Sequence, residues 1–215
     1  MADGRRPTDR RVALRLADGD GRAAGIRATA DRLGIELEER PGETDGTSIG
    51  NTRLPDDTPD WFIEAALLRA LEPSHILFLC VANSARSQLG EGLARALAEA
   101  SNADGGSAPV KISSAGSVPT RVRPQAIEVM REIGIDISHH RSNGVDDVER
   151  PVDVVITLCA EEVCPVWLDT AVRVHWGLPD PAGAGDSEDE ELQAFRDARD
   201  ELRRRLGVLF GGRAL

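Results

Sequence analysis

Residues 75–87 decide the fold, and they read His75-Ile-Leu-Phe-Leu-Cys80-Val-Ala-Asn-Ser-Ala-Arg86-Ser87. The run from His75 to Leu79 is almost entirely apolar, which is typical of a strand that is buried on both faces of a parallel sheet. A polar loop follows, and leucine then recurs at every fourth position, which predicts an amphipathic helix over about 85–100. The order strand, loop, helix indicates the first unit of an α/β fold.

The chain from Ser74 onward repeats this alternation of short apolar runs and amphipathic segments, so we expect one α/β domain over residues 74–215. After the opening unit, the expected elements are a strand over 110–114, a helix over 123–133, strands over 152–158 and 172–175, and a terminal helix over 190–209. Buried strands that are separated by helices imply a parallel sheet with right-handed crossovers.

Residues 1–73 differ from the rest because they contain no cysteine and no strongly strand-like run. One helical pattern spans roughly 22–37, and a second helix is expected to begin at Thr58-Pro59-Asp60, with Thr58 as N-cap and Pro59 at the first helical position. We therefore expect an α-helical N-terminal extension. Its second helix is too apolar to lie free in water, so it must pack on the α/β domain or on a second copy of the chain; we favour a homodimer through residues 1–73.

The composition excludes several classes of function. The 215-residue chain has 26 basic and 37 acidic residues and a formal net charge of -11, which argues against binding to nucleic acid or to a membrane surface. It has no run of roughly 18 apolar residues and no apolar stretch at its N-terminus, so we expect a cytoplasmic protein. The three cysteines form no Cys-x2-Cys metal motif, and in a reducing cytoplasm they are expected to be reactive thiols.

The loop after the first strand has a Cys-x5-Arg pattern, from Cys80 to Arg86. A loop at a helix N-terminus can surround a tetrahedral oxyanion with backbone N–H groups, which here belong to Val81, Ala82, Asn83, Ser84, Ala85, Arg86 and Ser87. The same environment favours a thiolate, so Cys80 is the expected nucleophile, and the planar guanidinium of Arg86 can bind two oxygens of the anion. The alternative is a core thiol beside a surface arginine; the strand before the loop and the helix after it favour an active site.

Around this loop the sequence resembles the low-molecular-weight tyrosine phosphatase superfamily, in particular its thioredoxin-coupled arsenate reductases, over about residues 76–210. The resemblance rests on motifs in the same order: Cys80-Val-Ala-Asn-Ser-Ala-Arg-Ser-Gln88, Glu91-Gly92, Ser114-Ala-Gly116, Pro124-Gln-Ala-Ile127, Gly134-Ile-Asp-Ile-Ser138, Thr157-Leu-Cys159, Cys164-Pro165 and His175-Trp-Gly-Leu-Pro-Asp-Pro-Ala-Gly183. It implies a four-stranded parallel sheet in the order 2-1-3-4, with the oxyanion loop at the carboxyl end of its first strand.

The resemblance also implies roles for three further residues. Asp180 would protonate the oxygen that leaves the bound oxyanion. Cys159 and Cys164 would form a relay with Cys80: Cys80 attacks arsenic, Cys159 attacks Cys80 and releases arsenite, and Cys164 takes over the disulfide, which thioredoxin or a similar dithiol donor reduces. Four residues separate Cys159 from Cys164, so a disulfide between them needs local unwinding of a helix.

Neither a metal nor a cofactor is expected. Some relatives bind potassium beside the loop, and Asn83, Glu91 and Ser114 match that set, but Arg141 and Asn143 replace the residues that would complete it. The remaining titratable candidates are histidines at strand or loop positions, which we interpret as structural: His75, His140 and His175.

Three functions remain open. The favoured one is an arsenate reductase that binds arsenate, or phosphate or sulfate as its analogue, and is recycled by thioredoxin. The second is a phosphatase that acts on phosphate monoesters. Phosphatases of this superfamily commonly carry a tyrosine after the Asp-Pro pair, whereas here Ala182 stands there and the chain has no tyrosine. The third is a non-catalytic phosphate- or redox-sensing module with residues 1–73 as its docking arm.

Overall fold

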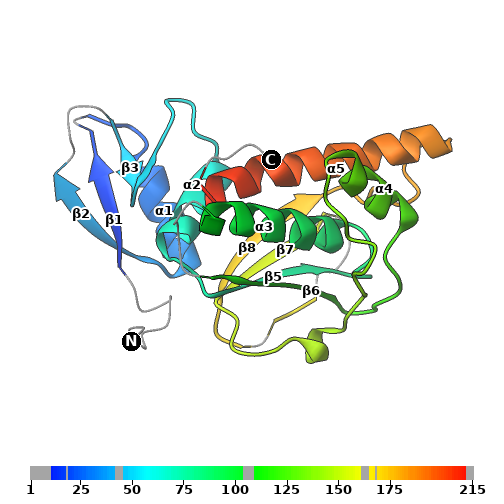
Figure 1. Ribbon diagram of the computed structural model, residues 1–215. Helices are drawn as coiled ribbons and strands as arrows, with labels where there is room; N and C mark the ends of the chain where they lie inside the picture. Colours follow the sequence, from blue (N-terminus) through cyan, green and yellow to red (C-terminus); the bar gives the residue numbers. More distant parts are fainter. Residues whose placement is uncertain are drawn as a thin grey trace.

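The computed structural model describes residues 11–17, 19–41, 46–103, 109–160, 165–167 and 169–211. These residues form two sheets, each covered by its own helices (Figure 1). The larger sheet belongs to the second part of the chain, and the smaller one is built from residues before His75.

The larger sheet has four parallel strands in the order β6-β5-β7-β8. Its strands are β5 (His75–Cys80), β6 (Lys111–Gly116), β7 (Val154–Cys159) and β8 (Val172–Leu178). Counted from β5, this is the 2-1-3-4 order that the resemblance implied, so the predicted fold class is confirmed for this part of the chain. Every residue of β5 is buried, as a central strand with helices and loops on both faces requires.

Helices cover the larger sheet chiefly on one face, where α3, α4 and α5 lie together (Figure 1). Their bounds are Arg86–Ala103, Pro124–Glu132 and Glu188–Leu209, and a short 3-10 turn, η2, spans Val145–Asp147. Ile76 and Phe78 of β5 join the main core cluster, whereas Leu77 and Leu79 join a smaller cluster with Trp167. Because successive side chains of a strand point to opposite faces, residues 76–79 make both faces of β5 apolar, and Cys80 follows them at its carboxyl end.

The N-terminal part is not purely helical, so the prediction of an α-helical extension is wrong. It contains β1 (Arg11–Leu16), α1 (Ala23–Leu33), β2 (Glu36–Pro41), β3 (Ser48–Ile49), β4 (Thr52–Arg53) and α2 (Asp60–Ala70). The sheet order is β2-β1-β3-β4, with β1 parallel to β2 and the other pairs antiparallel. In β1 the buried residues Val12 and Leu14 alternate with more exposed ones, which is the period of a half-buried strand.

Both predicted N-terminal helices exist, but their ends differ from the prediction. α1 stops at Leu33 because Gly34 adopts a left-handed conformation (φ 69°) and ends the helix. In α2 the N-cap is Pro59, so Thr58 lies one residue outside the helix, where its hydroxyl donates to the carbonyl of Pro55 and accepts from Arg22.

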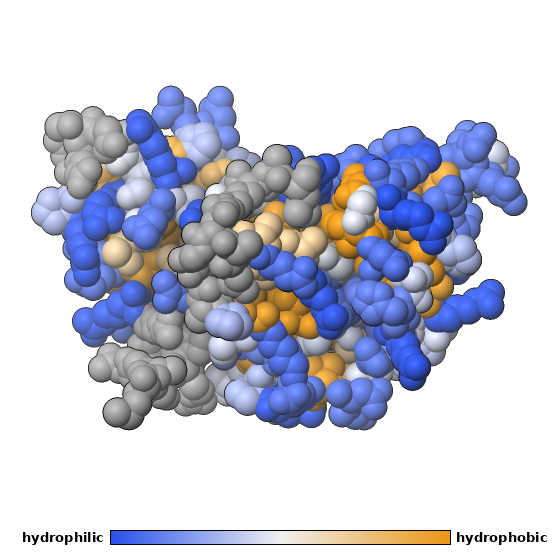
Figure 2. All heavy atoms as spheres, in the orientation of Figure 1, coloured by the Kyte–Doolittle hydropathy of each residue, from blue (hydrophilic) through white to orange (hydrophobic). Residues whose placement is uncertain are grey.

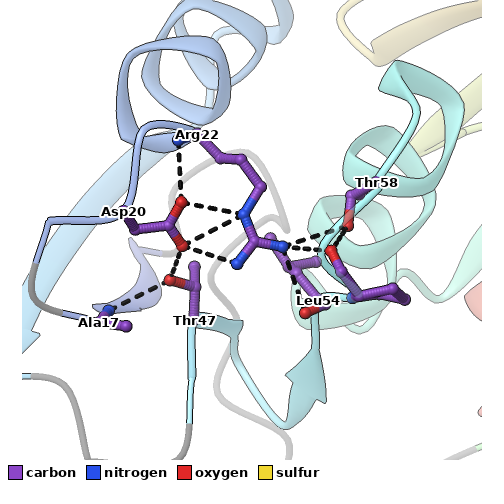
Figure 3. A network of polar contacts seen from close by, with 7 residues as sticks. Ala17, Asp20, Arg22, Thr47, Leu54 and Thr58 are labelled. Atoms are coloured by element: carbon purple, nitrogen blue, oxygen red, sulfur yellow. Dashed lines mark hydrogen bonds and ion pairs between the residues drawn. The ribbon is translucent and has the colours of Figure 1, made fainter.

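Polar contacts connect the turn after β1 to the segment that leads into α2 (Figure 3). The carboxylate of Asp20 accepts from the backbone and the guanidinium of Arg22 at 2.7–2.9 Å, and also from the hydroxyl of Thr47. Arg22 extends in turn to the carbonyl of Leu54 at 3.3 Å. These hydrogen bonds, above all those from Arg22, hold the pKa of the Asp20 carboxyl well below its usual range. The network fixes where the chain enters α2.

Helix α2 joins the two parts of the molecule. It packs against α5 of the larger domain and against α1, β1 and β3 of its own unit, and Ile63, Ala65, Ala66, Leu67 and Leu68 are buried (Figure 1). The apolar face of α2 is therefore covered by the α/β domain of the same chain, which is one of the two arrangements expected from the sequence. The homodimer through residues 1–73 stays a prediction.

The surface is largely polar on the face shown in Figure 2, where hydrophilic side chains surround the apolar areas that remain visible. Among the described residues, the large hydrophobic side chains that stand exposed are Val118 and Val166. The helices of the described part include none that is both long and apolar enough to span a bilayer.

Candidate active site

The Cys-x5-Arg loop lies at the carboxyl edge of the larger sheet. β5 ends at Cys80, and α3 begins at Arg86. β5 has β6 on one side and β7 on the other, so the chain reverses its direction of progress across the sheet at this strand. In open α/β sheets such a switch point is where ligands bind.

The carbonyl groups of the loop point outward, into neighbouring backbone. The carbonyls of Val81, Ala82 and Ser84 accept from the N–H groups of residues 118, 120 and 123 at 2.9, 3.0 and 2.9 Å. Because the carbonyl and the following N–H of a trans peptide point in opposite directions, the N–H groups that follow these carbonyls point into the loop. A concave ring of N–H groups of this kind can hold a tetrahedral anion.

Asn83 holds the loop in this shape from within. It is fully buried and adopts a positive φ of 46°, which asparagine tolerates better than most residues. Its side-chain NH2 donates to the hydroxyls of Ser87 and Ser114 at 2.8 Å each, and its side-chain oxygen accepts from the N–H of Asn143 at 2.7 Å. Gln88 adds a second support, since its NH2 group donates to the carbonyl of Asn83 at 3.1 Å.

The sulfur of Cys80 lies at the base of the loop, 2.9 Å from the hydroxyl oxygen of Ser87. That oxygen already accepts from Asn83, so the Ser87 proton is available to a thiolate. Charge-assisted hydrogen bonds of this type stabilise the anionic form of the acceptor. Cys80 is therefore placed to react as a nucleophile toward an anion held by the loop.

Arg86 is buried at the other end of the loop and is held by the end of β8. Its Nη1 donates to the carbonyl of Leu178 at 3.0 Å, and its Nη2 lies 3.2 Å from a carboxylate oxygen of Asp180. The Asp180 side chain is about half exposed. The structure thus brings Cys80, Arg86 and Asp180 to one place, although they come from three different segments of the chain.

Cys159 ends β7, which is the neighbour of β5, and its backbone is paired with Leu178 of β8. It is buried, as is Cys80. Both cysteines therefore end their strands at the same edge of the sheet. Cys164 lies outside the described residues, so its place in the predicted relay stays a prediction.

A second layer of polar residues supports Asn83. The Ser114 hydroxyl donates to Glu91 at 2.5 Å, and Glu91 pairs with Arg95 at 2.5 Å. Burial raises the pKa of the Glu91 carboxyl. Asn83, Ser114 and Glu91, which match the potassium site of some relatives, are thus connected by hydrogen bonds. The Arg95 guanidinium supplies a positive charge beside them. Within the described ranges, no group of three or more His, Cys, Asp or Glu side chains is placed to bind a metal ion.

The histidines have structural partners. His75 is hydrogen-bonded on both ring nitrogens, to the Pro151 carbonyl and the Ser113 hydroxyl. His140 contacts the side-chain oxygen of Gln88 at 2.9 Å, and burial lowers the pKa of His140 to about 4, so the ring is neutral at neutral pH. His175 contacts the Thr157 hydroxyl at 2.9 Å.

Two residues that shape the loop were not singled out as site residues from the sequence, Gln88 and Gly116. A side chain at position 116 would place its Cβ 2.3 Å from the carbonyl oxygen of Val81 and 2.7 Å from the nitrogen of Asn83. Only glycine lets the end of β6 approach the loop so closely. The Ser-Ala-Gly motif at 114–116 could have indicated this close approach, because a glycine in a strand often marks a place where another backbone comes near.

A parallel sheet with a Cys-x5-Arg loop at its switch point and an aspartate over the arginine defines a class of protein. The family model of low molecular weight phosphotyrosine protein phosphatase matches residues 75–214, and the chain belongs to this family.

Within the family, the curated relatives that the chain resembles are arsenate reductases. The chain is 39% identical over 134 residues to an arsenate reductase of Halalkalibacterium halodurans. The aligned region covers 61% of this chain and 91% of that protein. It is 38% identical over 139 residues to an arsenate reductase of Bacillus subtilis, with 63% and 94% covered. A solved structure of an arsenate reductase in the reduced state is similar with a TM-score of 0.50 and 31% identity, over 66% of this chain and 99% of that one.

Proposed function

We propose that this protein is an arsenate reductase that works through a thiolate adduct on Cys80. The observation that carries the proposal is the loop itself: it connects Cys80 to Arg86, and its carbonyls are bound from outside, which leaves its N–H groups to an anion. The similarity to curated arsenate reductases at 38–39% identity supports arsenate as the oxyanion. We further propose that the protein works in the cytoplasm, where thiols are kept reduced.

In the first step the Cys80 thiolate attacks the arsenic of bound arsenate. A sulfur–arsenic bond forms, and one arsenic–oxygen bond breaks. Asp180 supplies the proton with which that oxygen leaves as water, and Arg86 with the loop N–H groups balances the remaining negative charge.

The second step is a two-electron reduction. The Cys159 thiolate attacks the Cys80 sulfur, and the electron pair of the sulfur–arsenic bond stays on arsenic, which leaves as arsenite. Cys164 then attacks Cys159 in the Cys80–Cys159 disulfide and releases the Cys80 thiolate. Thioredoxin, or a similar dithiol protein, reduces the Cys159–Cys164 disulfide. The pairing of Cys159 with Leu178, whose carbonyl binds Arg86, supports the role of Cys159.

Hydrolysis of phosphate monoesters is the second candidate function. Cys80, Arg86 and Asp180 suffice for a cysteinyl-phosphate route, in which water resolves the intermediate. Such a reaction needs neither Cys159 nor Cys164. Arsenate reduction is favoured because a second cysteine, Cys159, ends β7 at the edge that carries the loop.

A coupled assay tests the two functions in one protein. NADPH consumption is followed with thioredoxin and thioredoxin reductase, with and without arsenate, beside hydrolysis of an aryl phosphate. We expect arsenate-dependent NADPH consumption. Cys164→Ser should release about one equivalent of arsenite per enzyme and stop, and Cys159→Ser should release none, while neither change should much affect ester hydrolysis.

Quench-flow arsenite yields and non-reducing peptide mapping read out the intermediates, with a Cys80–Cys159 disulfide expected in Cys164→Ser. Full turnover in both cysteine variants would show that an external thiol resolves the Cys80 adduct. A parent enzyme that hydrolyses the ester and does not reduce arsenate would establish the phosphatase instead.

A further inference from the structure

A buried carboxylate of the N-terminal part contacts the strand that supports the active site. One oxygen of Glu64, in α2, accepts from the Arg32 guanidinium of α1 at 2.7 Å. The other oxygen accepts from the indole N–H of Trp176, in β8, at 2.8 Å. Glu64 and Trp176 are 7% and 1% exposed. A buried carboxylate is stable only when its oxygens are hydrogen-bonded, so these contacts tie α2 to β8.

From Trp176 the strand runs directly into the active site. Two residues further on, the Leu178 carbonyl accepts from Arg86 at 3.0 Å, and two residues after that Asp180 pairs with the same arginine at 3.2 Å. Trp176 and Leu178 point to the same face of β8, since side chains two residues apart share a face. The indole that binds Glu64 thus lies two residues before the carbonyl that binds Arg86.

The end of β8 has little support from its own sheet. Among the described strands, β8 lies at the edge of the sheet and pairs with β7, and the register of this pair shifts between Thr157 and Cys159. The irregularity falls beside Leu178, the residue that holds Arg86. Contacts from outside the sheet consequently matter more here than at β5, which has strands on both sides.

The contact with Glu64 is an addition of this chain to the family fold. The family match begins at residue 75, and the two arsenate reductases reported above align with 61% and 63% of this chain. Arg32 and Glu64 both lie before the matched residues.

We propose that Glu64 is a positioning residue for the active site. By binding the indole of Trp176 it holds the end of β8, so that the Leu178 carbonyl and Asp180 orient Arg86 toward the oxyanion. The N-terminal part is then a component of the active-site scaffold. A test of this proposal by arsenate turnover rests on the proposed function, whereas a test by the affinity for inorganic phosphate does not.

The test compares Glu64→Leu, which removes the acceptor, with Glu64→Gln, whose amide oxygen can still accept from the indole. Val12→Ala, a truncation in the core of the same unit, is the matched control for lost stability. Trp176→Phe removes the donor and keeps an aromatic ring. Phosphate affinity is measured by calorimetry, and kcat and KM for arsenate are measured separately, all well below each variant's unfolding midpoint.

We expect Glu64→Leu and Trp176→Phe each to weaken phosphate binding and to lower kcat/KM about tenfold, because small displacements of catalytic groups are costly. Glu64→Gln should stay within about threefold of the parent, and Val12→Ala within about twofold. Equal losses in Glu64→Leu and Val12→Ala, or unchanged phosphate affinity in both Glu64→Leu and Trp176→Phe, would overturn the proposal. A parent that binds phosphate but does not reduce arsenate would refute the proposed function and leave this test intact.

Discussion

Two turns of the molecule have the same architecture and opposite chemistry. β1 leads into α1 and returns in parallel β2, and β5 leads into α3 and returns in parallel β6. In the first turn the carboxylate of Asp20 accepts from Arg22, so the chain supplies its own anion at the start of the helix. In the second turn residues 81–85 contain no acid, the carbonyls of the loop are bound from outside, and the Cys80 sulfur contacts the Ser87 hydroxyl.

The comparison shows that a strand, a turn and a helix N-terminus do not by themselves make a reactive site. An arginine in the turn is also insufficient, because the Arg22 guanidinium is paired with the Asp20 carboxylate of its own turn and also binds the Leu54 carbonyl, whereas Arg86 is held by the end of β8. What distinguishes the second turn is a nucleophile, a guanidinium and N–H groups with no acidic residue between them. Each of these differences can be tested separately.

The largest effect should come from the nucleophile. Cys80→Ser should lower arsenate turnover by about a thousandfold or more, because a serine hydroxyl is not ionised at neutral pH. Phosphate binding, measured by calorimetry, should persist, since the N–H groups and Arg86 remain. Measurable steady-state arsenite production by this variant would show that Cys80 is not the attacking thiol.

A smaller but still large effect is expected at the guanidinium. Arg86→Lys should lower kcat/KM about a hundredfold, because an ammonium group cannot bind the Leu178 carbonyl and two oxyanion oxygens in one plane. Arg131→Lys, an exposed position at the end of α4, is the matched control. Activity of Arg86→Lys within threefold of the parent would mean that the anion is held by other groups.

The smallest effect should arise in the turn between β1 and α1, which has no nucleophile. Asp20→Asn should lower the free energy of unfolding by about 1–2 kcal/mol at pH 7, because charge-assisted hydrogen bonds to Arg22 become neutral ones. It should leave kcat/KM unchanged below the unfolding midpoint. Urea unfolding measures the difference, with Asp31→Asn on the exposed side of α1 as control.

The pH dependence of this difference follows from the lowered pKa of Asp20. The stabilisation is fully present above the ordinary carboxyl pKa of 3.8 and is lost as the pH falls toward the lower value of the folded state. The parent and Asp20→Asn should therefore converge in stability in acid. A gap that stays constant below pH 3.8 would contradict the assigned ion pair.

The sequence is informative about the larger domain because its signals are local. Apolar runs and leucine spacing place its strands and helices, and the Cys-x5-Arg pattern sits between the first two of them. The N-terminal strands are less visible. β1 has a period of two that could have been recognised, but β2 reads Glu36-Leu-Glu-Glu-Arg-Pro41, which has one large apolar residue, and β3 and β4 are two residues long each.

The supports of the site depend on contacts that are distant in sequence. Gln88 was visible in the motif, yet its bond to His140 spans 52 positions, and Glu64 meets Trp176 across 112 positions. A single sequence indicates which side chains could react and does not indicate which partners orient them. The predicted cap at Thr58 is wrong for a related reason, because the Thr58 hydroxyl oxygen accepts from Arg22, which lies 36 positions away.

The close approach of Gly116 to the loop has a consequence for how this enzyme tolerates change. A library of single substitutions selected for growth on arsenate should reject every replacement at position 116 as firmly as at position 80, although glycine carries no reactive group. Alanine, the smallest replacement, would already force Val81 and Asn83 apart from the end of β6. Selection at position 116 therefore acts on the absence of a side chain, because the loop that binds the anion needs the room that a Cβ would take.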